Sequence, residues 1–88
     1  MRSRATQRFW RLFANLPEEA PRLAVKNYRL WRENPSHPSL HFRPLQGQPD
    51  LFTIRIGDHY RALGSVKSGT VTWIWIGAHA EYQRMIRG

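Results

Sequence analysis

The side chains best suited to chemistry in this sequence are histidines and arginines. Histidine can take up and release a proton near neutral pH, and arginine presents a planar fork of donors that fits a phosphate group. Cleaving a phosphodiester bond without a metal requires a base, an acid and cations that hold the charge developing on the phosphate oxygens. The candidates for proton transfer are His41, His59 and His79, with Arg55 and Arg61 as the nearby cations.

Among these residues, we predict that His79 transfers the proton and that Arg55 and Arg61 stabilise the phosphate. Tyr82 is predicted either to stack on a substrate base or to donate a proton. A plainer alternative stands beside each assignment: His79 as a helix-capping or surface residue, Tyr82 as a ring packed at the domain edge, and the arginines as a solvated face. The two sets of roles predict different surroundings for the same side chains.

Composition limits the classes of protein that the chain can represent. Its 88 residues suit one domain spanning residues 1–88, because autonomous domains mostly run from ~50 to ~200 residues. The absence of cysteine excludes disulfides, thiolate nucleophiles and cysteine-ligated metal centres. The six acidic residues show no spacing typical of a closed ligand set, and the glycines are dispersed, so we predict neither a metal nor a cofactor.

The charge balance favours a polyanionic partner. The formal net charge is +8 and the sequence pI is about 11.4. Every cation except Lys26 and Lys67 is an arginine, a composition that suits phosphate binding, although a solubilising charge excess is the alternative. No apolar stretch approaches the ~20 residues that span a bilayer, and residues 1–11 lack the apolar run of a signal peptide. We therefore expect a cytoplasmic protein without membrane contact.

Apolar residues at helical spacing predict two helices in the first part of the chain. The first lies between Thr6 and Leu16, and the second runs from Pro17 to about Glu33, where Asn34-Pro35 ends it. Joined at a proline, the two helices are expected to form an antiparallel hairpin. The face of the first helix is formed by Phe9, Leu12, Phe13 and Leu16.

The period changes to two residues in the second part, which predicts strands over 40–43, 52–57, 59–66 and 70–76. Alternation places His41, Arg43 and Arg55 on the face away from the core. Tyr60 and Ala62 compete with Leu63 for the core, and His59 and Arg61 join the basic face if the first pair is buried. We therefore predict an α+β fold, in which the hairpin packs on a small, mainly antiparallel sheet of three to five strands. The last strand is expected to be central, the opposite face of the sheet polar, and residues 79–86 a short C-terminal helix.

The order of these elements and several local strings resemble the RelE/ParE superfamily of bacterial toxins. The strings are Trp31-Arg-Glu-Asn-Pro35, His37-Pro-Ser-Leu40, Ile54-Arg-Ile-Gly-Asp-His-Tyr-Arg61 and Trp75-Ile-Gly-Ala-His-Ala-Glu-Tyr82. The likeness covers nearly the whole chain, and its most specific pieces are the paired arginines of the third string and the terminal His-x-x-Tyr of the fourth.

The resemblance implies a type II toxin with an acidic antitoxin as its partner. Many members cut messenger RNA in the ribosomal decoding site, whereas the ParE branch inhibits DNA gyrase, and the fold alone does not separate the two. By position, the residues that bind the phosphate and transfer the proton match Arg55, Arg61, His79 and Tyr82. The surface that binds nucleic acid is expected to include His41, Arg43, His59 and Arg84.

The sequence departs from the family pattern in two respects. Many members begin with a strand, for which only Met1 to Ala5 is available here, so that strand is expected to be absent or very short. The predicted basic face also carries no glutamate to match the general base of one branch of the family, and no lysine pair to match that of another. A non-catalytic module that binds nucleic acid is therefore an alternative to the ribonuclease and to the gyrase inhibitor.

Overall fold

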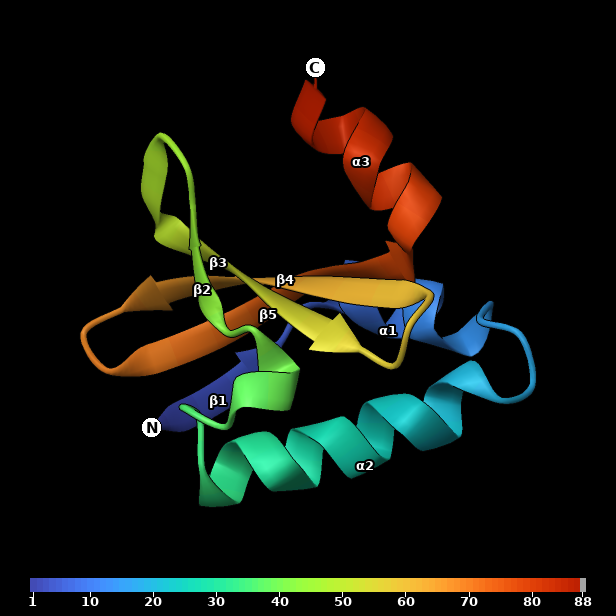
Figure 1. The fold of residues 1–88 in the computed structure, drawn as a ribbon, viewed down its shortest axis with the longest axis horizontal. Coiled ribbons are helices and arrows are strands. Elements are labelled where there is room, and N and C mark those ends of the chain that lie inside the picture. Colours follow the sequence, from blue (N-terminus) through green and yellow to red (C-terminus); the bar gives the residue numbers. More distant parts are fainter. Residues whose placement is uncertain (88) are drawn as a thin grey trace.

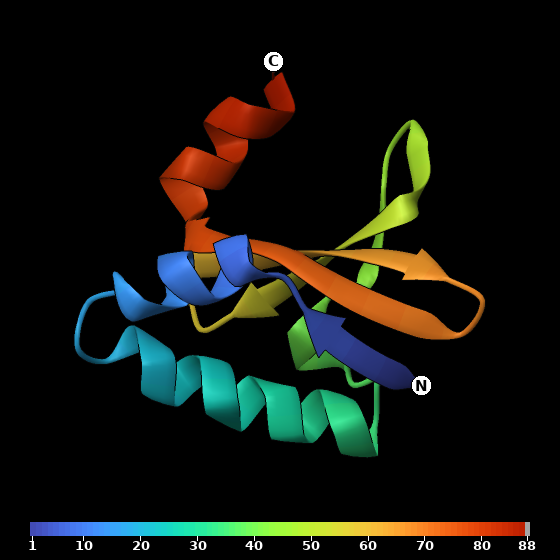
Figure 2. The ribbon, with the colours of Figure 1, turned by 180° about the vertical axis from the view of Figure 1, so that it is seen from behind.

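The chain forms a five-stranded sheet with α2 beneath one face and α3 rising from the other (Figures 1 and 2). The computed structural model describes residues 1–87. Its elements are β1 (Arg2–Ala5), α1 (Gln7–Ala14), α2 (Ala20–Glu33), the 3-10 turn η1 (Pro38–Leu40), β2 (Arg43–Leu45), β3 (Gln48–Ile56), β4 (Tyr60–Lys67), β5 (Thr70–Ala78) and α3 (His79–Arg87). The strand order is β1-β5-β4-β3-β2, which confirms the predicted α+β class.

A strand does precede the first helix, and it is very short. The four residues of β1 pair in parallel with β5, from Arg2 opposite Thr70 to Ala5 opposite Trp73. The strand ends where Thr6 caps α1, because the Thr6 hydroxyl oxygen accepts a hydrogen bond from the Phe9 N–H at 3.1 Å. All other neighbouring strands are antiparallel, as the sequence predicts.

Both helices of the hairpin are shorter than predicted. Helix α1 ends at Ala14 because the next two N–H groups, of Asn15 and Leu16, bond to carbonyls three residues back and tighten the last turn. Helix α2 begins at Ala20 instead of Pro17, and the preceding acidic pair lies in a turn. Asn34 ends α2 at the predicted place.

The predicted strand over residues 40–43 is displaced, because the strand found there, β2, begins only at Arg43. Pro38 opens the short turn η1, and the Nδ1 atom of His37 accepts a hydrogen bond from the Ser39 N–H at 3.2 Å, which closes it. Leu40 ends this turn fully buried, and His41 follows in the left-handed region with a φ of 48°. His41 therefore precedes β2 and takes no part in the alternation of a strand.

The core lies between the helices and one face of the sheet. Trp31 is at its centre with no exposed surface, and its ring meets those of Phe42 and Trp73 edge to face at 5.7 Å and 5.4 Å. Ala62 and Ile76 join this cluster from β4 and β5. We call the face of the sheet that bears this core the helix face, and the other the open face.

The open face is not simply polar, which corrects the prediction made from alternation. A second apolar cluster there consists of Leu63, Trp75 and Tyr82, and Leu45 and Leu51 of the β2–β3 hairpin pack against it. Tyr82 belongs to α3, so this cluster attaches the C-terminal helix to the sheet. The open face is thus apolar in its middle.

An irregularity in β5 explains how two tryptophans two residues apart reach opposite faces. The pairing with β4 passes from Trp73 opposite Gly64 to Trp75 opposite Leu63, leaving Ile74 without a partner as an extra residue. Trp73 therefore points into the main core, and Trp75 into the second cluster. Gly64 makes room for the Trp73 ring, because a Cβ there would lie 2.9 Å from it.

Candidate functional site

Two arginines of the open face lie directly opposite each other at one end of the sheet. Arg55 on β3 pairs with Arg61 on β4, and residues that pair across antiparallel strands project on the same side. Like charges in this position destabilise a sheet, so folding alone does not favour the pair. Arg43, the first residue of β2, pairs with Thr53 and adds an exposed cation on the same face.

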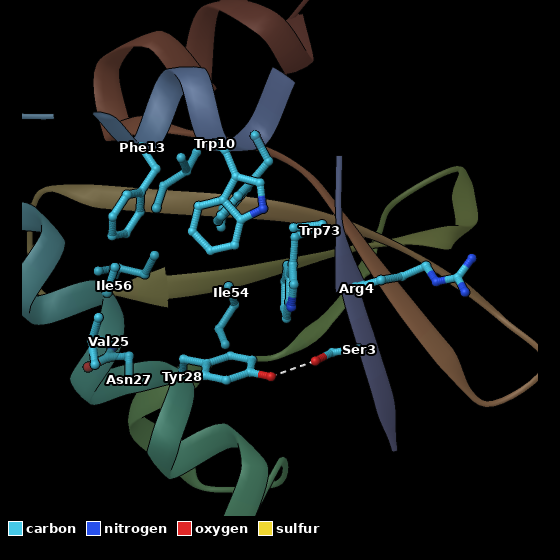
Figure 3. Close-up of a pocket in the computed structure, with 15 residues that line it drawn as sticks. Ser3, Arg4, Trp10, Phe13, Val25, Asn27, Tyr28, Ile54, Ile56 and Trp73 are labelled. Atoms are coloured by element: carbon cyan, nitrogen blue, oxygen red, sulfur yellow. Dashed lines mark hydrogen bonds between the residues drawn. The ribbon is translucent and has the colours of Figure 1, made fainter. Parts of the chain in front are cut away.

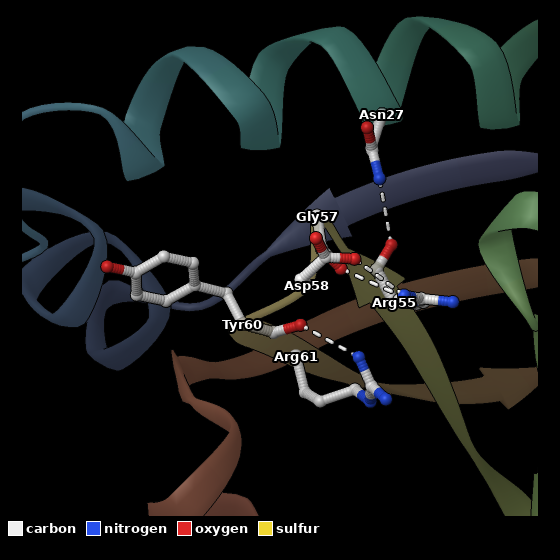
Figure 4. Close-up of polar contacts among 6 residues, drawn as sticks. All are labelled: Asn27, Arg55, Gly57, Asp58, Tyr60 and Arg61. Carbon is white, nitrogen blue, oxygen red and sulfur yellow. Dashed lines mark hydrogen bonds and ion pairs between the residues drawn. The ribbon is translucent and has the colours of Figure 1, made fainter.

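Arg55 is held by the turn between β3 and β4. Its Nε donates to the Gly57 carbonyl at 3.1 Å, and its guanidinium forms an ion pair of 2.7 Å with Asp58 (Figure 4). Asn27 of α2 anchors the same residue from the helix side by donating to the Arg55 carbonyl at 2.9 Å. The side chains of Arg55 and Asp58 are 35% and 78% exposed, so water screens this pair.

The surroundings of Arg61 disfavour the charged form of its guanidinium. Partial burial lowers its pKa first, and the positive charges of Arg55 and Arg43 lower it further, while Tyr82 acts in the opposite direction. The Arg61 guanidinium donates to the backbone carbonyl of Tyr60 at 3.1 Å. Arginine remains protonated at any physiological pH, so the site holds converging positive charge that an anion would stabilise.

Tyr82 and His79 stand beside this cationic cluster on α3. The Tyr82 ring is 7% exposed and its centroid lies 6.5 Å from that of Trp75, so the burial favours packing over base stacking. The His79 ring stacks on Tyr82 with centroids 6.1 Å apart. His79 Nδ1 is buried and has no partner within residues 1–87, and Nε2 lies 3.2 Å from the side-chain nitrogen of Gln83.

The other predicted binding residues lie in the β3–β4 turn, on α3 and just before β2. His59 is exposed in the β3–β4 turn, and its carbonyl accepts a 2.7 Å hydrogen bond from the His79 N–H, which fixes the start of α3. Arg84 is exposed on α3. His41 is exposed before β2, outside any strand. The structure therefore brings together arginines from three strands and Tyr82, and leaves His41 outside the sheet.

Two polar residues at this site were missed by the sequence reasoning. Asp58 forms an ion pair with Arg55. The sequence pattern that could have predicted this pair is a carboxylate three residues after an arginine, with a glycine turn between them. Gln83 contacts His79 from the next helical turn, at the i+4 spacing. In the part of the chain that the structure describes, no three His, Asp or Glu side chains gather as metal ligands, and no helix is long and apolar enough to cross a membrane.

A pocket of about 280 Å³ opens on the other side of the molecule, between α1, α2 and the helix face (Figure 3). Its floor is the core itself, including Ile54 and Trp73. Trp10 and Val25 line it although they are 55% and 42% exposed, and an exposed hydroxyl pair of 2.6 Å between Ser3 and Tyr28 lies at its edge. Large apolar side chains exposed together mark a surface for an apolar partner.

Solved toxin structures share this fold at low sequence identity. This chain is similar to one in a RelB-RelE antitoxin-toxin complex from Methanococcus jannaschii, with a TM-score of 0.74 and 13% identity, over 93% of this chain and 96% of that one. The isolated Escherichia coli RelE toxin has a TM-score of 0.67 and 18% identity, over 98% of this chain and 96% of that one. A YoeB/ParE toxin from Agrobacterium tumefaciens has a TM-score of 0.68 and 18% identity, over 90% of this chain and 99% of that one. No curated protein sequence matches.

The topology and the sequence signal together define the class of this protein, a toxin of the RelE/ParE superfamily. The sequence model of the ParE-like toxin domain matches residues 22–84, from the start of α2 into α3. The chain belongs to the ParE-like toxin domain family. The expected superfamily is confirmed, and the matched range includes the arginine pair, His79 and Tyr82.

Proposed function

We propose that this protein is the toxin of a toxin–antitoxin pair and that it cleaves messenger RNA at the ribosome in the cytoplasm. The observation that carries the proposal is the position of Arg61, half-buried among the positive charges of Arg55 and Arg43. A cation in such surroundings favours binding of a phosphate, because each hydrogen bond to the anion offsets both the cost of burying the charge and the repulsion from the neighbouring arginines. The family and the structural neighbours support the part of the proposal that makes this protein a toxin.

The proposed reaction is attack of a 2′-hydroxyl on the adjacent phosphorus, which expels the 5′ oxygen of the next nucleotide and leaves a 2′,3′-cyclic phosphate. Arg61 and Arg55 stabilise the charge that develops on the phosphate oxygens. His79 and Tyr82 share the proton transfer in this proposal: one takes the proton from the 2′-hydroxyl, and the other supplies a proton to the leaving oxygen. Arg43, His41, His59 and Arg84 bind the flanking backbone in this proposal.

The proposed partner is an antitoxin with an acidic and partly apolar segment. The net charge of +8 attracts an acidic chain, and the exposed Trp10 and Val25 at the α1–α2 pocket offer anchoring positions for apolar side chains. The similarity to the RelE chains of RelB–RelE complexes from Methanococcus jannaschii and Pyrococcus horikoshii supports an antitoxin as the partner.

A second candidate function is inhibition of DNA gyrase by binding alone. The family description is ParE-like. The side chain of His79 would also have to move before either ring nitrogen could reach a substrate, because Nδ1 is buried and Nε2 contacts Gln83. This function requires no proton transfer. It predicts DNA damage while translation continues, whereas the ribonuclease predicts cut messages.

The two functions separate when the protein is induced in cells and messenger ends are mapped. We expect cleaved messages with wild type and intact messages with the double variant Arg61→Ala/His79→Ala. Growth arrest by both proteins with intact messages would remove the ribonuclease function. An accompanying rise in DNA damage signalling would then support gyrase as the target.

Asp58→Asn is expected to strengthen RNA binding about twofold to fivefold, because it removes the carboxylate that pairs with Arg55 and frees the guanidinium for phosphate. The change is isosteric and Asp58 is exposed, so the free energy of unfolding should fall by less than about 1 kcal/mol. Fluorescence anisotropy with a labelled RNA oligonucleotide measures the affinity. Weaker binding by the variant would mean that Asp58 orients Arg55 for its ligand.

A further inference from the structure

The open face carries a second group of cations at the end of the sheet opposite Arg61. The registers place Lys67, Thr70 and Arg2 in one row across β4, β5 and β1. Ser65, Thr72 and Arg4 form the next row. We call these six residues the β1 platform.

The direction of the platform side chains follows from their neighbours. Val71 and Trp73 alternate with the two threonines of β5 and belong to the main core, so the threonines face the other way. On β1, Ser3 bonds to Tyr28 of α2 on the helix side, and Figure 3 shows the Arg4 side chain leading away from the pocket. Arg2 and Arg4 therefore project on the open face with the threonines.

The platform combines free cations with hydroxyl donors at a regular spacing. Neighbouring strands lie ~4.8 Å apart and same-face residues of a strand ~6.6 Å apart, so the cations surround the hydroxyls within about 10 Å. Arg2, Arg4 and Lys67 are exposed and form no ion pair within residues 1–87, where Arg55–Asp58 is the salt bridge present. The strands β1, β4 and β5 contain no Asp or Glu.

We infer that the β1 platform is a second binding site for the RNA backbone. It lies about 20 Å along the sheet from Arg61, the length of the six residue steps of β4 from Arg61 to Lys67. The inference rests on the proposed function for its choice of RNA. Guanidinium and hydroxyl groups together are the donors that nucleic-acid-binding proteins direct at phosphate oxygens. The platform holds a strand whose scissile phosphate lies at the arginine pair.

The platform fits a phosphate backbone better than a protein partner. Protein interfaces depend on apolar or aromatic anchors at their centre, and the two rows contain only cations and hydroxyl side chains. The anchors are on the far side, where Trp10 lines the α1–α2 pocket. An acidic antitoxin segment therefore has its better site elsewhere, and RNA is the ligand that the platform supports.

The experiment compares two triple variants with the same change in charge. Arg2→Ala/Arg4→Ala/Lys67→Ala removes the platform cations, and Arg22→Ala/Lys26→Ala/Arg29→Ala removes exposed cations of α2 on the helix side. The probe is a short single-stranded RNA with 2′-O-methyl groups throughout, which binds without being cleaved. Anisotropy titrations at several salt concentrations give the affinity and its salt dependence, and circular dichroism checks that both variants are folded.

We expect the platform variant to bind about tenfold more weakly, with a slope of log affinity against log salt smaller by about 2, since each phosphate contact on a single strand contributes about 0.7. The α2 variant should change much less. Equal losses in both variants would overturn the inference in favour of overall charge. Wild-type affinity of the platform variant for the RNA probe would also overturn the inference. This holds even if the same variant binds a polyglutamate peptide, which stands for an acidic protein segment, more weakly than wild type does.

The outcome is separable from the proposed function. If the platform variant binds the probe like wild type and still cuts messages in cells, the platform is wrong and the ribonuclease stands. If wild type binds the probe and the platform variant does not, but neither protein cuts messages, the platform stands and the cleavage reaction is wrong. A wild-type protein that does not bind the probe at all overturns the platform directly.

Discussion

Replacing Arg61 with alanine is expected to slow RNA cleavage by about 10²- to 10³-fold, the usual effect of removing one group that stabilises developing charge. The substitution should not lower stability, because burial and the neighbouring Arg55 and Arg43 both oppose the charged guanidinium in the folded protein. The free energy of unfolding is expected to stay constant or to rise. This combination distinguishes a residue that acts on the substrate from one that supports the fold.

The measurement uses purified ribosomes programmed with a defined message, and urea unfolding of the same preparations. Arg61→Lys keeps the charge and loses the planar fork, so its rate should fall between wild type and Arg61→Ala. Arg22→Ala removes an exposed charge on α2 and serves as the matched control. A rate for Arg61→Ala close to wild type would contradict the role of Arg61, and a large loss of stability would show a structural role instead.

Replacing Trp31 with alanine is expected to lower the free energy of unfolding by about 3–5 kcal/mol, the range for removing a buried large aromatic side chain. Trp31 has no exposed surface and its ring meets Tyr28, Phe42 and Trp73 at 5.9, 5.7 and 5.4 Å. Small domains are stable by only about 5–15 kcal/mol, so the variant should be partly or largely unfolded at 37 °C.

Trp10→Ala is the matched control, since Trp10 is 55% exposed and its loss should lower stability by about 1 kcal/mol or less. Urea unfolding followed by far-ultraviolet circular dichroism measures both variants. Trp31→Phe should recover much of the loss because an aromatic ring still fills the space. Equal effects of the two tryptophan substitutions would mean that α2 contributes little to the core.

Period and spacing predicted the face of Arg55, but they left the face of Arg61 open. Tyr60 and Ala62 competed with Leu63 for the core in the sequence pattern, and the pairing of Arg55 with Arg61 across β3 and β4 shows that the two arginines face the same side. The helices were also predicted from spacing, and their ends differ by a few residues because turn hydrogen bonds compete with helical ones at Ala14 and Ala20.

The rest depends on contacts that a local pattern does not contain. The extra residue Ile74 reverses the face of Trp75 relative to Trp73, and only the pairing with β4 reveals it. The side-chain acceptor of His37 turns a candidate strand into η1 and removes His41 from the sheet. Tyr82 is buried because α3 folds onto the open face, a tertiary contact that a terminal His-x-x-Tyr string does not specify.

The order of strands in the sheet also affects how copies of this protein meet. The outer strands are β1 and β2, with four and three residues, and each offers few free backbone groups for another chain to extend. Arginines on β1 and Pro44 on β2 further discourage such pairing. A toxin built in this way resists self-association through its sheet edges, and it can accumulate in a concentrated cell without forming aggregates by that route.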